Sequence, residues 1–510
     1  MRGLCSKRPP APSDPPFERI PLPGDKHTGE CMADDCIAGV DFGTSKIAIV
    51  VIDPKRNSIL FTESEPHGGD IGLANHSLKE QSVEGVMDAF NRLFGRLENE
   101  LRAGARSLRS IGLTGQMHGI VGIDGDGKAV TELVTWQDGR GNALQKGGKT
   151  LIQLMEERGG RRRIASGYGI VTLFDWTLNR RYSRFAGFCT ISDYAGMLLT
   201  GKKRPSMDPT MAESTGAFDL EKGAWDERYI AALGIDRGLF PPVLPTRTVI
   251  GDARGAGRPG MGGEGGVPVT VSLGDNQASF IGSVRELYSS LLVNIGTGSQ
   301  VSFAAGSARE AQDLADIDGY DVTLRPFVDG GVLVAGSALS GGVVYRTLHD
   351  FFAEAGRELF NAETGASRHG SLYDLMERLA GSGDDAGGLE VYPLFAGKRS
   401  DPSARGRIGG ISLANLTPRN LVRATLEGEV RILREMITEK ALCKADVLVG
   451  SGNGIRRNAL LRSIASRVFG KTLRTPAHEE EAALGAAIHG AVAAGVYRGY
   501  GEARDVISYD

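Results

Sequence analysis

The stretch that decides the fold is Gly39-Val40-Asp41-Phe42-Gly43-Thr44-Ser45-Lys46. A similar stretch, Val293-Asn294-Ile295-Gly296-Thr297-Gly298-Ser299-Gln300, follows about 250 residues later. Each lies between two apolar runs, and each predicts a β-hairpin whose tip exposes backbone N–H groups and small hydroxyls. Such tips hold anions well, because glycine lets the main chain approach phosphate oxygens. One of them alone would more often be an ordinary turn, but one in each half favours a duplicated fold that holds a nucleotide between two domains.

The gross composition is that of a globular protein with two large domains. The chain has 510 residues, of which 41% are hydrophobic and 24% charged, and this length exceeds what one core usually holds. The net charge of -3 gives no reason to expect a nucleic acid or a membrane as partner. The five cysteines have neither Cys-x-x-Cys nor zinc spacing. They predict reduced thiols in a cytoplasmic protein.

The first 36 residues differ from the rest. Seven prolines fall between Pro9 and Pro23, and no apolar segment of a signal peptide is present. We expect a disordered leader over residues 1–36, with Met32 as a candidate natural start.

The pattern after the leader predicts strands over 37–40, 47–52, 58–64 and 110–114, with an amphipathic helix from 83 to 101 before the last of them. This β-β-β-α-β order is typical of a ribonuclease-H-like domain. We therefore predict an α/β fold of two ribonuclease-H-like domains around a central cleft. The first spans 37–285, the second spans 286–498, and 499–510 form a tail. A glycine-rich surface loop is expected at 251–266, before a strand over 269–273.

The second half shows a similar pattern of strands and helices, but less clearly. It predicts a hairpin over 291–304, a strand over 331–335, and helices over 343–355, 419–439 and 458–468. A strand over 446–449 runs into the glycine-rich segment 450–454 and then into a helix N-terminus. That succession is typical of a phosphate or nucleotide site. The alanine-rich stretch 482–494 is too short for a membrane span and predicts a packed helix.

Two aspartates stand where chemistry is expected. Asp41 ends the first strand beside the first turn, where a carboxylate can hold Mg²⁺ against nucleotide phosphates. Asp275 directly follows an apolar strand, where it can take a proton from a substrate hydroxyl as a phosphoryl group arrives. The alternatives are a local turn-forming role for Asp41 and a helix N-cap role for Asp275.

Two further segments carry groups suited to a sugar. In Thr114-Gly115-Gln116-Met117-His118-Gly119, the amide and imidazole can bind hydroxyls and the methionine supplies an apolar wall. In Trp136-Gln137-Asp138-Gly139-Arg140, the indole can face the C–H side of a sugar while Asp138 and Arg140 contact its hydroxyls or a phosphate. The alternatives are a core histidine and a core tryptophan with a surface ion pair.

Taken together, these residues resemble the FGGY carbohydrate kinase family, within the actin, Hsp70 and hexokinase superfamily. The resemblance runs from about Ile37 to Tyr497. The family's C-terminal signature is matched by Gly406-Arg407-Ile408-Gly409-Gly410-Ile411 and, eight residues later, by Asn420-Leu421-Val422-Arg423-Ala424-Thr425-Leu426-Glu427. A non-metabolic actin-like ATPase would share both phosphate turns, but it would not need the two sugar segments. A catalytically silent sugar-sensing relative is a further alternative, against which the presence of both aspartates argues.

The resemblance implies transfer of the γ-phosphoryl group of ATP, with Mg²⁺, to a hydroxyl of a sugar or polyol. It implies Asp275 as catalytic base and Asp41 as metal ligand. It implies nucleotide binding by Gly43, Thr44, Ser45, Gly296, Thr297, Gly298, Gly341, Gly452, Asn453 and Asn458. It implies substrate binding by Gln116, Met117, His118, Trp136, Asp138 and Asn276. Members of the family are often dimers, so a homodimer is possible, although no interface can be recognised in the sequence.

Within the family, the two sugar segments resemble those of kinases that act on ketoses. Glycerol kinases have Gln-Arg-Glu where this chain has Gln116-Met117-His118, which argues against glycerol. Segments 133–140, 274–279 and 450–458 resemble sedoheptulokinases most, and Asn276 is closer to xylulokinases. We therefore expect sedoheptulose as substrate, with xylulose or a similar ketose as the second candidate and another polyol as the third.

Overall fold

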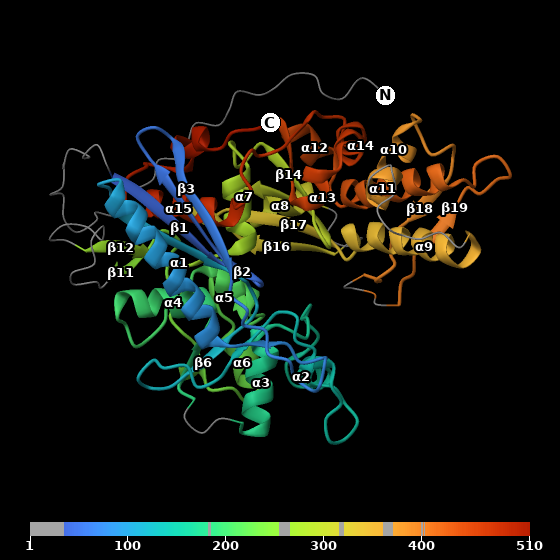
Figure 1. Ribbon diagram of the computed structural model, residues 1–510. Coiled ribbons are helices and arrows are strands. Elements are labelled where there is room, and N and C mark those ends of the chain that lie inside the picture. The colour runs from blue at the N-terminus through green and yellow to red at the C-terminus, as the bar shows by residue number, and fades with distance from the viewer. Residues whose placement is uncertain are drawn as a thin grey trace.

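The computed structural model (Figure 1) describes residues 35–181, 185–253, 266–315, 321–360, 371–398, 401 and 403–510. Apart from Asp35 and Cys36, the leader expected over 1–36 lies outside these residues, as does Met32. Those two residues already belong to the first strand. Most of the loop expected at 251–266 also lies outside, and its first three residues form the end of a strand instead.

The first half is built on a mixed sheet, which confirms the predicted β-β-β-α-β order. Its strands follow the spatial order β11-β12-β5-β1-β2-β3, and β13 also pairs with β5. The strands are β1 (Asp35–Phe42), β2 (Lys46–Asp53), β3 (Ser58–Pro66), β5 (Ser107–Gly115), β11 (Val249–Ala253), β12 (Val267–Thr270) and β13 (Leu273–Gly274). The expected strand over 269–273 is thus split into β12 and β13.

The second half repeats this arrangement with a sheet of order β16-β17-β15-β14-β20-β21. Its strands are β14 (Ser290–Ile295), β15 (Ser299–Ala305), β16 (Val322–Pro326), β17 (Val332–Ala338), β20 (Val447–Ser451) and β21 (Leu473–Arg474). In both sheets the hairpin predicted from a glycine turn is antiparallel, and its first strand also pairs with a parallel strand, β1 with β5 and β14 with β20. The pairing of the strands in the two sheets thus confirms the predicted duplicated fold.

The main helices pack on the two sheets or on one another. They are α1 (Val83–Ala103), α4 (Ile191–Thr200), α7 (Asp275–Ser283), α8 (Ala308–Leu314), α9 (Gly342–Phe360), α10 (Leu372–Gly381), α11 (Pro418–Glu435), α12 (Glu439–Lys444), α13 (Gly452–Arg457), α14 (Ala459–Phe469) and α15 (Glu481–Ala493). The apolar face of α1, with Phe90, Leu93 and Phe94 buried, confirms the predicted amphipathic helix. None of the helices in the described residues is long and apolar enough to cross a membrane.

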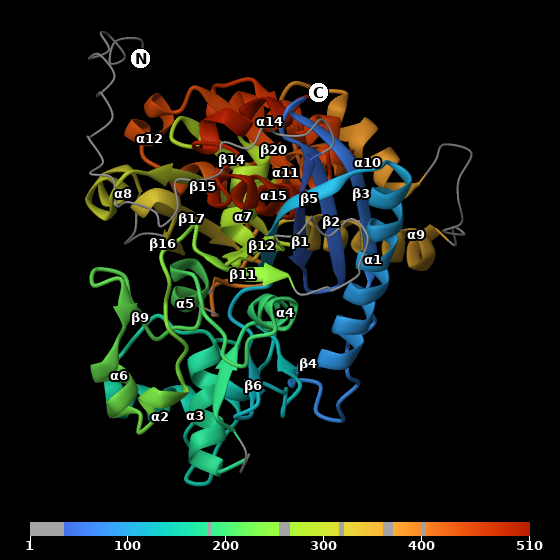
Figure 2. The same ribbon diagram turned by 90° about the vertical axis from the view of Figure 1, so that its left-hand side faces the viewer.

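Between β5 and β11 the chain forms a lower lobe, coloured teal and green in Figures 1 and 2. It contains the helices α2 (Leu151–Gly159), α3 (Gly169–Asn179), α5 (Pro209–Ser214) and α6 (Glu227–Ala232) and the short ladders β6 (Val121–Ile123) with β8 (Gly187–Cys189) and β9 (Phe218–Asp219) with β10 (Ala224–Trp225). The strands β4 (Glu80–Gln81) and β7 (Leu133–Val134) pair beside it, and β18 (Glu390–Tyr392) pairs with β19 (Arg407–Gly409) in the second half.

The alanine-rich helix α15 packs between the two halves, next to α7 (Figure 2). Small residues are required there, because a Cβ at Gly112 would lie 1.8 Å from the carbonyl oxygen of Ala486, and one at Gly485 would lie 1.8 Å from that of Ala278. Phe280 of α7 packs edge-on against Phe327 of the second half, with ring centroids 5.7 Å apart. The prediction of a packed helix is confirmed, and close backbone approach explains its composition.

Three boundaries in the second half differ from the predictions. The helix expected over 419–439 ends at Glu435, because Thr438 caps a new helix by accepting a hydrogen bond from the Ala441 N–H. The glycine-rich segment 450–454 is not a loop: Gly450 and Ser451 continue β20, and α13 starts at Gly452. The expected tail is packed, since Tyr500, Val506 and Ile507 belong to the core between the sheets.

Candidate active site

Three neighbouring strand ends bring the predicted chemistry together. In the ladders β1–β5 and β13–β5, Asp41 and Leu273 both lie opposite Thr114. The Thr114 hydroxyl donates to the Leu273 carbonyl at 2.9 Å and so ties β13 to β5. Asp41 ends β1, the Gln116-Met117-His118 segment follows β5, and Asp275 follows β13. The same end of the first sheet, where these three strands terminate, therefore carries the candidate metal ligand, the candidate base and a candidate sugar segment.

Asp275 is the first residue of α7. Gly274 holds the N-cap position, so the alternative that Asp275 caps the helix is wrong. The Gly274 N–H donates to Oγ1 of Thr210 at 2.9 Å, which fixes the turn from strand to helix. Burial raises the pKa of the Asp275 carboxyl to about 6, and the positive charge of Arg325 opposes this rise. At neutral pH the carboxyl is mostly ionised and can accept a proton.

Asp41 has the features of a cation ligand. Its buried Oδ1 has no hydrogen-bond partner among the residues that the structure describes. Burial raises its pKa to about 8, and the negative charges of Asp275 and Glu480 add to the rise. A divalent cation would relieve this repulsion. In the described part of the chain, no three His, Cys, Asp or Glu residues are grouped to hold a metal. Mg²⁺ usually takes one or two carboxylates together with phosphates and water.

The first turn is held by side chains. Its Thr44 carbonyl accepts hydrogen bonds from Nε2 of Gln81 at 2.7 Å and pairs with Nε2 of His67 at 2.9 Å. The Thr44 hydroxyl accepts from the Trp136 indole at 3.0 Å, so the turn touches a predicted sugar residue. Gly43 is half-buried and Ser45 is exposed, while Lys46 pairs with Glu480 at 2.5 Å.

The second turn is held by main chain. Gly296 and Thr297 offer their carbonyls to the N–H groups of Gly342 and Val343, at 2.8 and 3.1 Å. A Cβ at Gly341 would lie 2.7 Å from the carbonyl group of Gly298, so glycine is needed there for close approach. The turn is thus fastened directly to the start of α9.

A cavity of about 500 Å³ opens beside the second turn. Four predicted nucleotide residues line it, Gly296 and Thr297 from the turn and Asn453 and Asn458 from α13 and the cap of α14. The Asn458 side chain also caps α14 by accepting from the Leu461 N–H at 2.8 Å. Gly452 does not line the cavity. Its φ of 83° and the 2.7 Å that would separate an added Cβ from the Ile295 carbonyl oxygen explain why glycine is needed there.

The residues that follow β5 lie at the same end of the sheet as Asp275. Gln116 is buried, and its Nε2 donates to Oε1 of Gln81 at 3.0 Å, while its own Oε1 has no partner in the described residues. His118 adopts a φ of 72°, stacks on Tyr168 at 4.3 Å and lies with Nδ1 2.6 Å from the Ser214 carbonyl. These contacts fix the imidazole in place, and the side chain is half-buried.

The Trp136 segment differs from the prediction at two residues, Asp138 and Arg140, whose buried side chains form an ion pair with each other. Trp136 is 41% exposed, so the indole is open to a ligand rather than a core residue. Asp138, however, is fully buried, and its oxygens accept from the Lys79 N–H and from the Arg140 guanidinium. The prediction that Asp138 contacts substrate disagrees with this geometry, because no face of its carboxylate is open. The ion pair is buried and holds the segment in place.

Two charged residues of the site were missed by sequence reasoning. Arg325 of β16 reaches across from the second sheet, with Nη1 3.6 Å from the Met117 sulfur, and its charge acts on both Asp275 and Glu213. Burial raises the pKa of the Glu213 carboxyl, and Arg325 opposes this rise. An arginine inside a strand with buried neighbours was the available signal for Arg325, whereas Glu213 had none.

A hydrogen-bonded chain also crosses between the halves. Nδ2 of Asn276, a predicted sugar residue, donates to Oε1 of Gln300 at 2.6 Å, and Nε2 of Gln300 donates to the Ser337 hydroxyl at 3.2 Å. The Asn276 Oδ1 is buried without a partner in the described residues. A ligand hydroxyl could donate to it.

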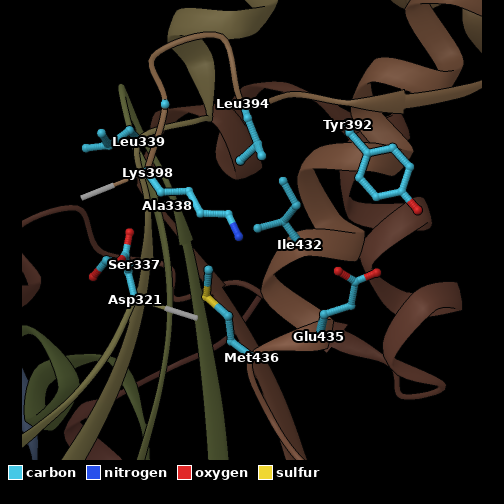
Figure 3. Close-up of a pocket in the computed structure, with 11 residues that line it drawn as sticks. Asp321, Ser337, Ala338, Leu339, Tyr392, Leu394, Lys398, Ile432, Glu435 and Met436 are labelled. Carbon is cyan, nitrogen blue, oxygen red and sulfur yellow. The ribbon is translucent and has the colours of Figure 1, made fainter. Parts of the chain in front are cut away.

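Behind Ser337 lies a smaller cavity of about 120 Å³ (Figure 3). Lys398 extends into it, and Leu394, Ile432 and Met436 form apolar walls. No predicted site residue lines it. It shares no lining residue with the cavity beside the second turn and includes neither Asp41 nor Asp275.

With this geometry described, the comparisons with known proteins can be stated. Residues 36–282 match the N-terminal domain, and residues 291–494 the C-terminal domain, of the FGGY family of carbohydrate kinases. The chain belongs to this family and is a phosphotransferase with an alcohol group as acceptor.

Individual relatives have different substrates. The chain is 26% identical to the sedoheptulokinase of Homo sapiens over 485 residues, which covers 88% of this chain and 96% of that protein. It is 27% identical to the glycerol kinase of Shewanella amazonensis over 493 residues, 92% of each. The crystal structure of xylulose kinase from Rhodospirillum rubrum superposes with a TM-score of 0.73 at 21% identity, covering 93% of each chain. The last likeness supports the predicted two-domain α/β fold.

Proposed function

We propose that this enzyme transfers the γ-phosphoryl group of ATP to a hydroxyl of a ketose, with sedoheptulose as first candidate and sedoheptulose 7-phosphate as product. The observation that carries the proposal is the placement of Asp41, Gln116-Met117-His118 and Asp275 at adjacent ends of β1, β5 and β13. We take the first domain, 37–285, as the sugar side and the second, 286–498, as the nucleotide side.

Each residue then has a defined task. Asp275 orients the acceptor hydroxyl and takes its proton, for which a pKa of about 6 is suitable at neutral pH. The N–H groups of the two turns bind phosphate oxygens. Asp41 would hold Mg²⁺, which supplies positive charge to the triphosphate. Trp136, whose indole is exposed, presents an apolar face to the sugar, whereas Met117 is packed in the core of the first half. Closure of the halves excludes water and limits ATP hydrolysis.

The charges of the sugar side favour a neutral acceptor. The carboxyl groups of Asp275 and Glu213 both interact with one cation, Arg325. A sugar acid would add a further negative charge to a buried site whose positive charge is already balanced. A neutral ketose adds none, and its hydroxyls can donate to Asn276 Oδ1 and Gln116 Oε1.

The test is a coupled ATP-consumption assay with sedoheptulose, xylulose, ribulose, glycerol and gluconate, ranked by kcat/KM. Sedoheptulose is expected to rank first and gluconate last. Activity highest on xylulose would favour the alternative, a xylulokinase. No turnover with any ketose, but turnover with glycerol, would contradict the ketose assignment. A cytoplasmic location and a homodimer remain predictions from the sequence and the family.

A further inference from the structure

The second sheet carries a row of polar side chains beside the second turn. Its members lie opposite one another on the adjacent strands β20, β14, β15 and β17, and they are Ser451, Asn294, Gln300 and Ser337. Side chains at opposite positions of neighbouring strands point to the same face of a sheet. Two hydrogen bonds run along the row, from Nδ2 of Asn294 to the Ser451 hydroxyl at 2.9 Å and from Nε2 of Gln300 to the Ser337 hydroxyl at 3.2 Å.

Gln300 is the member of this polar row that contacts the sugar side. It lies at the start of β15, next to the second turn, and its side chain is half-buried. Its Oε1 accepts a hydrogen bond from Nδ2 of Asn276 at 2.6 Å. Asn276 follows Asp275 in the first turn of α7. The nucleotide side therefore holds the residue next to the candidate base.

The direction of these hydrogen bonds determines what Asn276 presents to a ligand. An amide group has one side that donates and one that accepts. Gln300 uses its donor on Ser337, so its acceptor faces Asn276, and Asn276 in turn directs its donor to Gln300. The Oδ1 of Asn276 is left buried, without a partner among the described residues. A buried acceptor of this kind costs stability unless a ligand donates to it.

We propose that Gln300 is a positioning residue for the sugar: it holds the Asn276 amide so that Oδ1 accepts a hydrogen bond from a hydroxyl of the sugar. The inference rests on the proposed role of Asn276 in sugar binding. Without Gln300, the amide can rotate about its last bond, whose preference is weak, and place Nδ2 where Oδ1 was. The nucleotide side thus contributes to sugar binding without touching the sugar.

The experiment measures the KM values of the sugar and of ATP by steady-state kinetics on the full chain. The sugar is whichever compound of the assay panel the wild type turns over best. Gln300→Met keeps the length of the side chain and removes both polar atoms. It is expected to raise the KM of the sugar about 3- to 10-fold, the effect of one lost hydrogen bond. The KM of ATP should stay within about twofold, because main-chain bonds hold the turn.

Gln300→Glu separates positioning from packing, since its side chain is as long as that of Gln300→Met. Its carboxylate still accepts a hydrogen bond from Asn276, and the Ser337 hydroxyl can rotate and donate to it. The sugar is neutral, so the added charge alone has little effect on its binding. The assay is run at pH 8, where Asp275, with a pKa of about 6, is ionised. The KM of the sugar should remain within about twofold of wild type.

A double-mutant cycle tests whether Gln300 acts through Asn276. Asn276→Ala is expected to raise the KM of the sugar about 10-fold, because it removes the contact itself. Adding Gln300→Met to that variant should change the KM by less than about twofold, since no amide is left to position. Ser299→Ala is the control. It removes a hydrogen bond made by the neighbouring residue of β15, from Oγ to the Ser340 carbonyl at 2.6 Å, and should leave the KM of the sugar within about twofold.

The outcomes distinguish this inference from the proposed function. An unchanged KM of the sugar in Gln300→Met, an equal rise in Gln300→Met and Gln300→Glu, or losses that multiply in the double variant would overturn the inference alone. A wild type that turns over only glycerol would contradict the ketose assignment, and the same variants measured on glycerol would then decide the role of Gln300. A wild type that turns over no compound of the panel would overturn both. If Gln300→Met does not fold, Gln300→Leu makes the same test.

Discussion

The two glycine turns share a pattern but differ at the residue before the tip. Val40-Asp41-Phe42-Gly43-Thr44 has an aspartate where Val293-Asn294-Ile295-Gly296-Thr297 has an asparagine. Asp41 Oδ1 is buried and lacks a partner in the described residues, whereas Asn294 Nδ2 donates to the Ser451 hydroxyl at 2.9 Å. The first turn thus keeps a carboxyl oxygen without a partner among the described residues, whereas the corresponding amide of the second turn is already hydrogen-bonded.

The supports of the two turns differ in the same sense. The first is held mainly by side chains of the first half, Gln81, His67 and Trp136. The second is held mainly by main-chain bonds to the start of α9, together with one side-chain bond, from the Ser299 hydroxyl to the Ser340 carbonyl at 2.6 Å. The two copies of the hairpin therefore differ in the ligands that they can bind. One can bring a cation and an acid together, and the other can bind phosphate oxygens without adding a second negative charge.

The largest expected effect comes from removing the acid that faces the first turn. Asp275→Asn should lower kcat about 100-fold or more, because the hydroxyl loses its proton acceptor, with ADP affinity unchanged. Steady-state kinetics measure kcat, and calorimetry measures the affinity for ADP. Asp193→Asn is the matched control, since burial also raises the pKa of that carboxyl, to about 8, but it lies outside the site. Wild-type turnover in Asp275→Asn would remove Asp275 from the mechanism.

Asp41→Asn makes the first turn resemble the second. Loss of the metal ligand should lower kcat/KM about 10- to 100-fold, and raise the Mg²⁺ concentration needed for half-maximal rate. A magnesium titration of the rate measures both. If the requirement for Mg²⁺ were unchanged, the proposed difference between the turns would be wrong.

The same variant is also expected to change how the stability of the folded protein depends on pH. The pKa of Asp41 is about 8 in the folded protein against 3.8 in the unfolded chain, so the folded state binds the extra proton between these values. Stability contributed by this group therefore falls as pH rises from about 4 to about 8. Without Mg²⁺, Asp41→Asn should be more stable than wild type near pH 8, with a shallower decline, as measured by thermal unfolding across pH.

Asn294→Asp makes the opposite exchange. A carboxylate beside the second turn should repel phosphates and weaken ADP about three- to tenfold, while kcat for the sugar changes little. Asn294→Ala is the control, because it removes the bond to Ser451 and adds no charge, whereas the carboxylate of Asn294→Asp can still accept a hydrogen bond from the Ser451 hydroxyl. An equal loss in both variants would show that the loss of the asparagine, and not the added charge, weakens ADP binding.

The features that could be predicted from the sequence are those set by residues close together in the chain. Both hairpins, α1 and the packed α15 follow from local patterns and were predicted. The join of Gly450 and Ser451 to β20 was not, because pairing with β14 extends a strand through residues that prefer a loop in isolation. The early end of α11 depends on the Thr438 cap, whose hydroxyl also bonds to the Leu314 carbonyl, a distant partner.

The site shows the same limit. Asp41, Asp275 and Gly296 stand in motifs that favoured phosphate or acid chemistry over local structural roles, and the family resemblance implied the role of Asn453. Whether Asp138 is open to a ligand depends on Lys79 and Arg140, and the motif does not specify those contacts. Arg325 and Glu213 reach the site only through tertiary packing. No local pattern distinguishes Glu213 from an ordinary charged residue of a helix, and the only sign for Arg325 is its position inside a strand with buried neighbours.

The smallest expected effect concerns Arg325, the cation that the second half contributes to the first. Its charge lowers the pKa of Asp275 from the value that burial alone would give. Arg325→Met should therefore raise that pKa above about 6 and move the acidic limb of the kcat/KM profile to higher pH. Arg325→Lys keeps the charge and should leave the limb near its wild-type position. If the limb stays in place in Arg325→Met as well, the titrating group is not Asp275. In that case the charge balance between the two halves does not tune the base.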